Sequence, residues 1–278
     1  MTATSLDHAR GAAAGEDSRR AGDARETNTP SVTKALHLLD SFRGADVPLG
    51  VSAIARRSGI PKSTTHRLIA YLERSGYVER QGRGYVLGRL LFELGNSVLM
   101  CRPSGLREVA TPHLARLFAE QGQVVHLGVL DGAEVVCLEK LFGLGSVRVP
   151  TIVGGRTPAN CSSLGKAMLA FADRETLGRF FDTGLVRRTR YSRTTQGQLL
   201  AELRKVRAQH IAYDHEETQI GLVCTAAPIF ERGRAIAAVS VSGLPTQCNL
   251  AAVGEAVRRT ATAITRDLAV TGKLGVSA

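Results

Sequence analysis

The chain has 278 residues, of which 44% are hydrophobic, and 36 basic against 25 acidic residues give it a formal net charge of +11. This composition predicts one large or two modest globular domains and favours a polyanionic partner. Tryptophan is absent and aromatic residues make up only 5%, so base stacking on an aromatic platform, the usual mode of single-strand binding, is not indicated.

The first 29 residues are rich in Ala, Gly, Arg, Asp and Thr and contain no apolar run. We therefore expect 1–29 to be a disordered arm and neither a signal peptide nor a membrane anchor. Elsewhere, no uninterrupted apolar run approaches the roughly 18–20 residues of a membrane span. The sequence predicts a cytoplasmic protein without a membrane partner.

Free thiols are the expected state of the cysteines, because none of them shows a CxxC or Cys/His ligand spacing. His210, Asp214 and His215 lie close together in the sequence, but they contain no helical pair of histidines four residues apart, so we expect no metal and no cofactor. The five cysteines are Cys101, Cys137, Cys161, Cys224 and Cys248.

Three helices are expected between residues 31 and 76. Apolar residues repeat at helical spacing over 31–43, with Ser31 available as the N-cap. A helix of about two turns begins at Ser52 and ends at Gly59, and a third occupies the stretch between Pro61 and Gly76. The third is amphipathic, because its apolar residues form one stripe.

The third helix begins with six consecutive polar residues, Lys62, Ser63, Thr64, Thr65, His66 and Arg67. They form either a solvated helix start or a face that meets a polyanion. The N–H groups of a helix N-terminus favour phosphate oxygens. Serine and threonine contact phosphates or base edges, and arginine commonly binds guanine in the major groove.

A β-hairpin is expected at YVERQGRGYVLG, around the turn Gln81–Gly84. Three helices followed by a hairpin form the winged helix-turn-helix, which we assign to 30–87. Residues 31–86 have nine bases and four acids. The bases are Lys34, Arg43, Arg56, Arg57, Lys62, Arg67, Arg74, Arg80 and Arg83, and the acids are Asp40, Asp46, Glu73 and Glu79.

Residues 88–100 return to helical periodicity, and Pro103, Ser104 and Gly105 then interrupt the chain. We assign 88–103 to a linker helix, 104–272 to a second domain and 273–278 to a flexible tail. The apolar side of the linker helix belongs either to the core of one subunit or to a dimer interface.

The second domain alternates helical and strand-like stretches, with an Asp131-Gly132 hairpin signal between the first two strands. This pattern predicts an α+β fold around a mainly antiparallel sheet. Strands are expected at 124–130, 133–141, 146–150, 222–230 and 235–243, and helices at 106–122, 163–172, 173–182, 195–210 and 250–270.

The first half resembles the winged helix-turn-helix of the IclR family of bacterial transcription regulators, in ALHLLDSF, LGVSAIARRSGIPKSTTHRLIAYLERSGYVER and YVLGRLLFELG. The second half resembles the family's effector-binding domain, in GGRTPANCSSLGKAMLA, YDHEE, GLVCTAAPIF and AAVSVSG. The resemblance implies a GAF-like α/β effector-binding domain, a homodimer or dimer of dimers, and a small metabolite that modulates binding to a promoter or operator on double-stranded DNA. Most members repress and some activate.

The resemblance also implies residue roles. The DNA contacts are Lys62, Ser63, Thr64, Thr65, His66 and Arg67, with Arg83 at the wing tip approaching the minor groove or the phosphates. Exposed charge without a contact is the alternative for Arg83. The residues that line the ligand cavity are Val149, Ser163, Leu164, Asp214, Leu222, Cys224, Ser240 and Ser242.

This chain departs from the family pattern in two places. It has Asn160-Cys161 where the family often has His-Ala, and Ser163-Leu164 where small pairs such as Gly-Ala are common. The bulkier Leu164 predicts a smaller or reshaped cavity.

The chemistry of the cavity follows from the residues themselves. Alternate strand residues share a face, so Ser240 and Ser242 project together, either to solvent or toward a ligand carboxylate or hydroxyl. N–H groups at the start of the helix at 163 would add an anion-favouring site. Small hydroxy-, keto- or aromatic acids fit these donors.

Asp214 and Cys224 are expected to be polar walls of the cavity rather than catalysts. His126 lies between apolar neighbours, so a core or cavity position is expected for it, and no spacing supports its pairing with Cys161 or Cys224 as a nucleophile. We therefore expect no catalytic residue.

The leading hypothesis is a transcription regulator that represses from an operator and responds to an organic acid. An activator is a second possibility. The alternative from another class is an enzyme or metabolite sensor whose basic domain binds protein.

Overall fold

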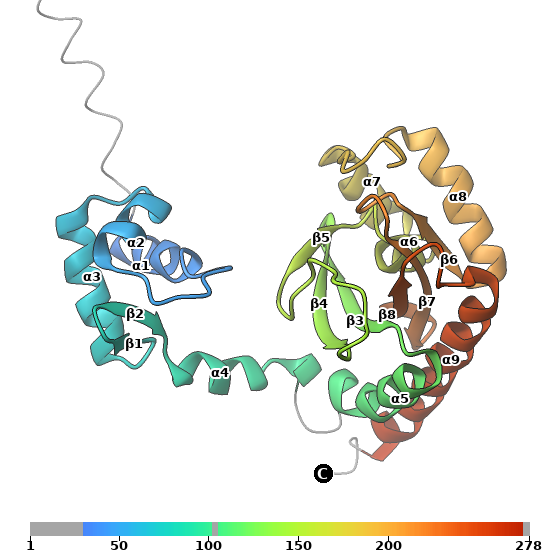
Figure 1. The fold of residues 1–278 in the computed structure, drawn as a ribbon, viewed down its shortest axis with the longest axis horizontal. Coiled ribbons are helices and arrows are strands. Elements are labelled where there is room, and N and C mark those ends of the chain that lie inside the picture. The colour runs from blue at the N-terminus through green and yellow to red at the C-terminus, as the bar shows by residue number, and fades with distance from the viewer. Residues whose placement is uncertain (1–29, 102–104, 275–278) are drawn as a thin grey trace, which may run out of the picture. The chain divides into compact units, whose positions relative to one another are not determined.

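The computed structural model describes residues 30–101 and 105–274, and the chain divides into two compact units between Asn96 and Ser97 (Figure 1). The predicted arm 1–29, the break at 103–104 and most of the tail 273–278 lie outside the described residues. Within the described ranges, no helix is long and apolar enough to cross a membrane.

The first unit contains the three predicted helices, the hairpin and the helix that follows it. The centre of its core includes Leu38, Ile54, Ile69 and Val78, each fully buried. The elements are α1 (Ser31–Asp40), α2 (Val51–Ser58), α3 (Lys62–Arg74), β1 (Val78–Gln81), β2 (Gly84–Leu87) and α4 (Arg89–Asn96).

Two predicted helix starts differ from the structure. Ser31 is the first residue of α1, whose N-cap is Pro30 without a side-chain hydrogen bond, and α2 begins at Val51 after Gly50. Gly59 ends α2 with a φ of 70°, a left-handed conformation that favours glycine. This residue allows the sharp turn from α2 into α3.

The predicted hairpin is confirmed. β1 and β2 pair antiparallel, with Gln81 opposite Gly84, and Gly82 adopts a φ of 58° at the tip. Arg83 therefore lies at the end of the wing. The predicted linker helix is shorter than 88–100, because α4 ends at Asn96 and only a short 3-10 turn, η1 (Leu99–Cys101), follows.

The second unit is built on a six-stranded sheet with the order β5-β4-β3-β8-β7-β6, in which every neighbouring pair is antiparallel. This arrangement confirms the predicted α+β class. The elements are α5 (Leu106–Gln121), β3 (Val124–Asp131), β4 (Glu134–Leu141), β5 (Arg156–Pro158), α6 (Ser163–Leu169), α7 (Arg174–Asp182), α8 (Gln196–Gln209), β6 (Ala212–His215), β7 (Val223–Glu231), β8 (Arg234–Gly243) and α9 (Leu250–Leu274).

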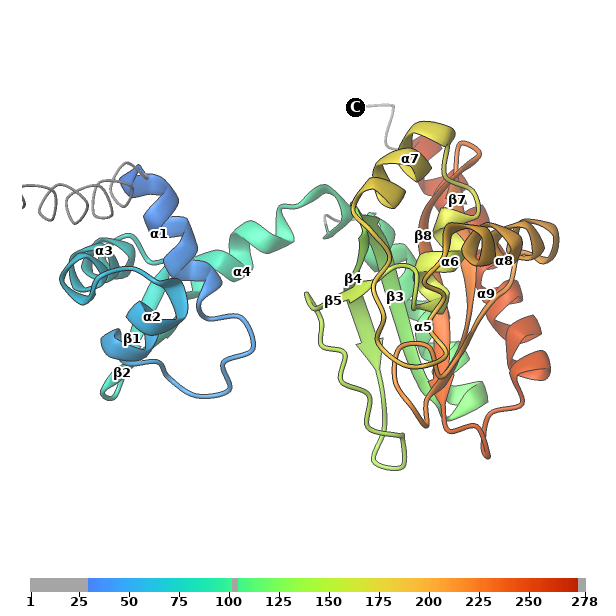
Figure 2. The same ribbon diagram turned by 90° about the horizontal axis from the view of Figure 1, so that it is seen from above.

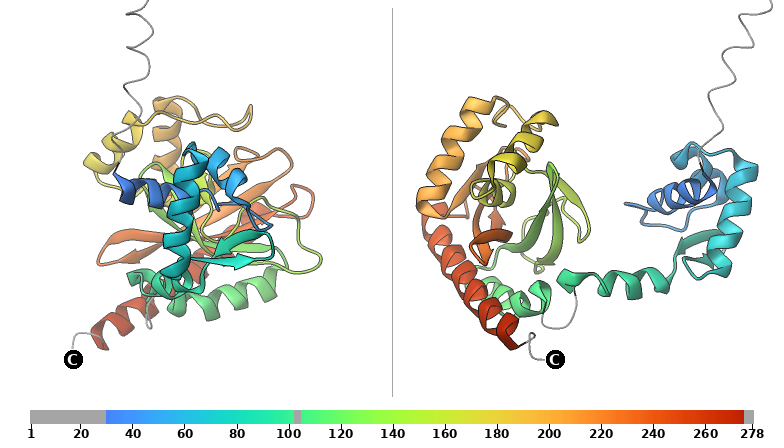
Figure 3. Two further views of the ribbon diagram at one scale, coloured as in Figure 1. Left: turned by 90° about the vertical axis from the view of Figure 1, so that its left-hand side faces the viewer. Right: turned by 180° about the vertical axis from the view of Figure 1, so that it is seen from behind.

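Helices cover both faces of this sheet, with α5 and α9 on one side and α6, α7 and α8 on the other (Figures 2 and 3). The alternation along β8 shows how the strand serves both faces. Val239 and Val241 pack in the cluster of α5 and α9, whereas Ala238 packs in that of α6 and α8. Ser240 and Ser242 therefore face the side of α6.

The predicted strand at 146–150 is wrong. This segment has no strand partner, and the Nζ of Lys140 instead donates to the carbonyl oxygens of Val149, at 3.2 Å, and Thr151, at 2.6 Å. The carbonyl oxygen of Val149 thus accepts from a side chain, and no strand is formed over 146–150. The short strand β6 was not expected from the sequence.

A fully buried lysine joins three segments on the α6 side of the sheet. The Nζ of Lys166 in α6 donates to Glu202 Oε1 of α8, at 2.6 Å, and to Glu217 Oε1 in the turn after β6, at 2.5 Å. Glu202 also accepts from Arg193 Nε at 3.0 Å. Removing one partner of a buried pair leaves an uncompensated charge, which is costly.

We expect Lys166→Met to lower the free energy of unfolding by about 3–5 kcal/mol, because it leaves Glu217 buried without its cation. Urea denaturation measures this loss. The control is Arg179→Met, which breaks the exposed pair with Glu175 and should cost less than about 0.5 kcal/mol. Equal losses in the two variants would contradict a structural role for Lys166.

Candidate functional site

The start of α3 presents most of its predicted polar face to solvent. Thr64 is half-buried, and the N-terminal N–H groups of α3 have no side-chain cap. At the wing tip Arg83 is exposed as well. The exposed residues of the α3 start are Lys62, Ser63, His66 and Arg67.

Thr65 lies in the interior of the domain, unlike its neighbours. Its side chain is fully buried, and its Oγ1 donates to the carbonyl oxygen of Ile60 at 3.2 Å. The structure therefore places Thr65 where it fixes the turn between α2 and α3, away from the exposed face on which it was expected.

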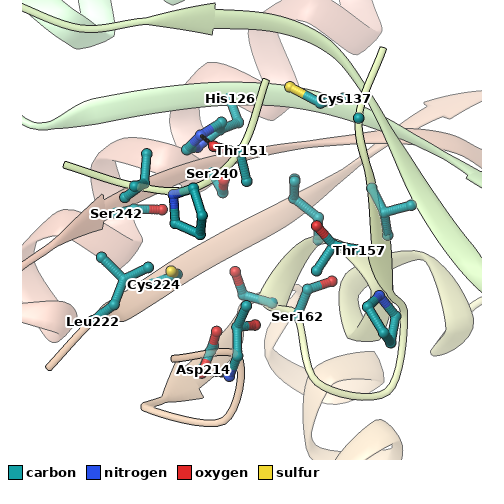
Figure 4. Close-up of a pocket in the computed structure, with 18 of the residues that line it drawn as sticks. His126, Cys137, Thr151, Thr157, Ser162, Asp214, Leu222, Cys224, Ser240 and Ser242 are labelled. Atoms are coloured by element: carbon teal, nitrogen blue, oxygen red, sulfur yellow. Dashed lines mark hydrogen bonds between the residues drawn. The ribbon is translucent and has the colours of Figure 1, made fainter. Parts of the chain in front are cut away.

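A cavity of about 310 Å³ lies in the second unit, between the sheet, the start of α6 and the segments around Thr151 and Thr157 (Figure 4). It brings together all eight residues that were expected to contact an effector, and its remaining lining is largely apolar or hydroxylated. The eight are Val149, Ser163, Leu164, Asp214, Leu222, Cys224, Ser240 and Ser242.

Strand pairing explains why four of these residues meet. Asp214 of β6 is the register partner of Cys224 in β7, and Cys224 is the partner of Ser242 in β8. In the next row on the same face, Ser240 is the partner of His126 in β3. The four strands thus form one polar floor.

Seven lining residues with hydroxyl, imidazole or guanidinium groups were not among the effector contacts expected from the sequence. His126 has a detectable signal, because it alternates with apolar residues along β3 and so occupies one face of the strand. The others lie in loops or in the three-residue strand β5, where no periodicity marks them. They are Thr151, Arg156, Thr157, Ser162, Arg188 and Thr218.

His126 is held as a neutral imidazole. Its Nε2 lies 2.7 Å from Thr151 Oγ1, and burial, together with the charge of Lys140, lowers its pKa from 6.5 to about 3. A neutral imidazole has one donor and one acceptor nitrogen, and Nε2 is already engaged with Thr151. It adds no positive charge.

Asp214 uses its carboxylate within the protein. Its Oδ1 accepts from the backbone N–H of Glu217 at 2.6 Å and of Thr218 at 3.4 Å. Burial raises the pKa of Asp214, against the opposing charge of Lys166. The side chain therefore shapes the turn after β6 as well as the floor of the cavity.

The thiol of Cys224 is not activated. Burial raises its pKa well above the usual value, and the charge of Asp214 raises it further. A protonated thiol is a weak nucleophile. This environment agrees with the expected role of Cys224 as a wall residue. In the described parts of the chain, no cluster of His, Cys, Asp and Glu could hold a metal ion.

Two family models match the chain, one in each unit. Residues 31–82 match the IclR helix-turn-helix domain, and residues 100–266 match the model described as "Bacterial transcriptional regulator IclR C-terminal". The second match alone spans more than half of the chain. The chain belongs to the IclR family.

Relatives agree with this membership. The HTH-type transcriptional regulator BhcR of Paracoccus denitrificans is 34% identical over 89% of this chain and 88% of its own. The transcriptional repressor IclR of Escherichia coli is 31% identical over 77% of this chain and 79% of its own.

A solved structure gives the fold match. An IclR homologue from Microbacterium hydrocarbonoxydans, in complex with 4-hydroxybenzoate, superposes with a TM-score of 0.79 at 28% identity, covering 87% of this chain and all of that one. As an IclR-family member, the protein is a DNA-binding transcription regulator and not an enzyme.

We expect His126→Gln to remove an acid-sensitive contribution to stability. The imidazole titrates near 3 when folded and near 6.5 when free, so the unfolded chain takes up the proton first and stability falls as the pH drops below 6.5. At about pH 4.5 the wild-type penalty is about 2–3 kcal/mol. Glutamine does not titrate and retains a hydrogen-bonding group for Thr151.

Urea titrations of both proteins at neutral pH and at about pH 4.5 measure this effect. As the pH falls, the free energy of unfolding should decrease more for the wild type than for His126→Gln. A difference between the two proteins that stays constant with pH would mean that folding leaves the pKa of His126 unchanged, which would contradict the burial-driven shift.

Proposed function

We propose that this IclR-family protein is a cytoplasmic repressor that binds an operator as a homodimer. A small organic acid would lower or raise its affinity for the operator. The observation that carries the proposal is the polar, uncapped and exposed start of α3. The same chain has a cavity whose buried floor contains hydroxyl groups. One unit can therefore meet DNA while the other binds a metabolite.

The proposed DNA contacts follow from exposure. We assign Lys62, Ser63, His66 and Arg67 to the face that enters the major groove, with Thr64 at its edge. Thr65 is left out, because its hydroxyl is buried. Arg83 at the wing tip is assigned to the phosphates or the minor groove. The remaining buried residues of α3 hold the helix to its domain.

Exposed apolar side chains support a dimer. Val32 and Leu36 of α1 are 72% and 56% exposed, and Phe92 and Leu94 of α4 are 73% and 46% exposed. Large apolar side chains grouped on one element mark interaction surfaces. We propose that α1 and α4 contribute to pairing with a second copy, and that two dimers can associate further.

Repression and acid binding are supported by relatives. The E. coli IclR protein is named a transcriptional repressor, and the Microbacterium homologue was crystallised with 4-hydroxybenzoate. A carboxylate or hydroxyl can accept or donate to Ser240 and Ser242 on the cavity floor. Because a ligand shifts DNA affinity only if it binds one arrangement of the chain better than another, we assign the coupling to the region of α4.

Arg67→Ala should weaken operator binding by about 1–3 kcal/mol and relax the sequence preference, because Arg67 is exposed at the reading end of α3. Gel-shift titration with the promoter of a neighbouring operon measures this. The control is Arg74→Ala, at the other end of the same helix, where the side chain donates to the Ala70 carbonyl. Equal effects of the two substitutions would remove the α3 start from the reading role.

Organic acids should raise the melting temperature of the protein, because a ligand bound only by the native state stabilises it. We expect a panel of small keto-, hydroxy- and aromatic acids to contain at least one such ligand. The Ser240→Ala/Ser242→Ala double variant should lose that shift. Its melting temperature without ligand is the control for intact folding. An undiminished shift would place the ligand elsewhere.

A further inference from the structure

The cations around the cavity differ in whether their charge is already compensated. Among the lining residues, only Arg156 and Arg188 have cationic side chains, since His126 is neutral. Arg156 forms ion pairs with Asp131, at 2.5 Å, and Glu134, at 3.5 Å. Its charge is therefore balanced within the protein.

Arg188 has no such partner. Its side chain forms no hydrogen bond and no ion pair with any residue in 30–101 or 105–274, and it is exposed. Two lysines outside the lining already have partners: Lys166 binds two glutamates, and Lys140 donates to the carbonyl oxygens of Val149 and Thr151. Arg188 therefore provides the one uncompensated positive charge on the described cavity wall.

The backbone that carries Arg188 is held at its ends. Asn160 Nδ2 donates to the carbonyl oxygens of Val186, at 2.8 Å, and of Arg193, at 3.0 Å, and Asn160 Oδ1 accepts from Val186 N–H. Asn160 is only 2% exposed. One buried amide thus joins both ends of the 186–193 segment to the chain just before α6.

The middle of the segment is held as well. Ser192 Oγ accepts from the N–H groups of Arg188, at 3.0 Å, and Thr189, at 2.9 Å, and it donates to the carbonyl oxygen of Glu217 at 2.8 Å. This bond joins Arg188 to the turn that also contains the lining residue Thr218. The segment is pre-ordered beside the cavity, which lowers the entropy cost of using its side chain.

The described floor of the cavity, unlike the wall at Arg188, contains no cationic side chain. It consists of Ser240, Ser242 and the neutral His126, each at most 3% exposed, and of Asp214, whose burial already disfavours a negative charge. These groups suit an uncharged polar substituent such as a hydroxyl. An anionic group would meet a carboxylate there and an uncompensated guanidinium at the exposed wall.

We propose that Arg188 binds the acid group of the effector at the mouth of the cavity, while the floor receives an uncharged polar end. This inference rests on the proposed function and specifies the ligand class: a monoanionic acid with an apolar body and a hydroxyl or similar group distant from the acid. Asn160 and Ser192 act as positioning residues for Arg188.

The test compares each acid with its own amide, which has similar shape but no charge. Calorimetric titration of the full-length protein with 4-hydroxybenzoate and 4-hydroxybenzamide, and with keto- and hydroxy-acid pairs, measures the acid-to-amide affinity ratio. Arg188→Gln should weaken acid binding roughly tenfold, since hydrogen bonds to charged groups are stronger than neutral ones. Amide binding should change little, and Arg188→Lys should restore part of the ratio.

Matched controls lie on the same segment. Arg187 donates to Thr194 and Arg190 to Tyr191, both are exposed, and neither lines the cavity. Arg187→Gln and Arg190→Gln should keep the wild-type ratio. Raising the salt concentration from about 50 to about 200 mM should weaken acid binding in wild type and less so in Arg188→Gln, because salt screens exposed charges.

The outcomes separate the two proposals. Acid binding that Arg188→Gln leaves intact, or a loss shared equally by acid and amide or by the control variants, overturns the role of Arg188 alone. If no acid of the panel binds the wild-type protein, the proposed effector function fails and this inference fails with it. Both proposals are supported if Ser240→Ala/Ser242→Ala abolishes acid binding and if Arg188→Gln alone lowers the acid-to-amide affinity ratio.

Discussion

The cavity of the effector domain depends on the ion pairs that the ammonium group of Lys166 forms with two carboxylates. Lys166 lies on α6, whose first residues line the cavity, and it binds one carboxylate from α8 and one from the turn after β6. Through Glu202 the same network reaches Arg193, at the end of the 186–193 segment. A single buried cation therefore fixes the spacing between three walls.

This network is balanced closely. Burial raises the pKa of Glu217 to about 7, although the positive charge of Lys166 opposes that shift. The cost of burying the second carboxylate is thus only partly offset by its partner. Glu202, which is less buried and also binds Arg193, keeps a lowered pKa. The charges of Lys166, Glu202 and Glu217 therefore pair with one another. We expect ligand recognition to depend on other side chains.

Much of the fold could be predicted from periodicity. The helices of the first unit, the wing and most strands of the sheet follow from apolar spacing and from turns such as Asp131-Gly132. The prediction failed at 146–150, where alternation resembles a strand but Lys140 binds the carbonyl oxygens. It also missed β5 and β6, since three or four residues are too few to show a period.

The candidate sites divide in the same way. Ser240 and Ser242 could be placed together because strand alternation is a local property, and the resemblance supplied the neighbours from other strands. The buried position of Thr65 could not be predicted, since it depends on the Ile60 carbonyl of the preceding turn. Arg188 could not be found either, because its place depends on Asn160, 26 residues before Val186, and on Ser192.

In the 186–193 segment, the residues that hold the backbone differ from the residue proposed to bind the ligand. The segment's backbone is held by buried polar groups, Asn160 and Ser192, whereas the side chain of Arg188 is exposed. Surface substitutions of this kind usually change stability by less than about 0.5 kcal/mol. With the role proposed for Arg188, a substitution at this rim changes ligand recognition at little cost in stability, whereas a substitution on the floor strands also disturbs core packing.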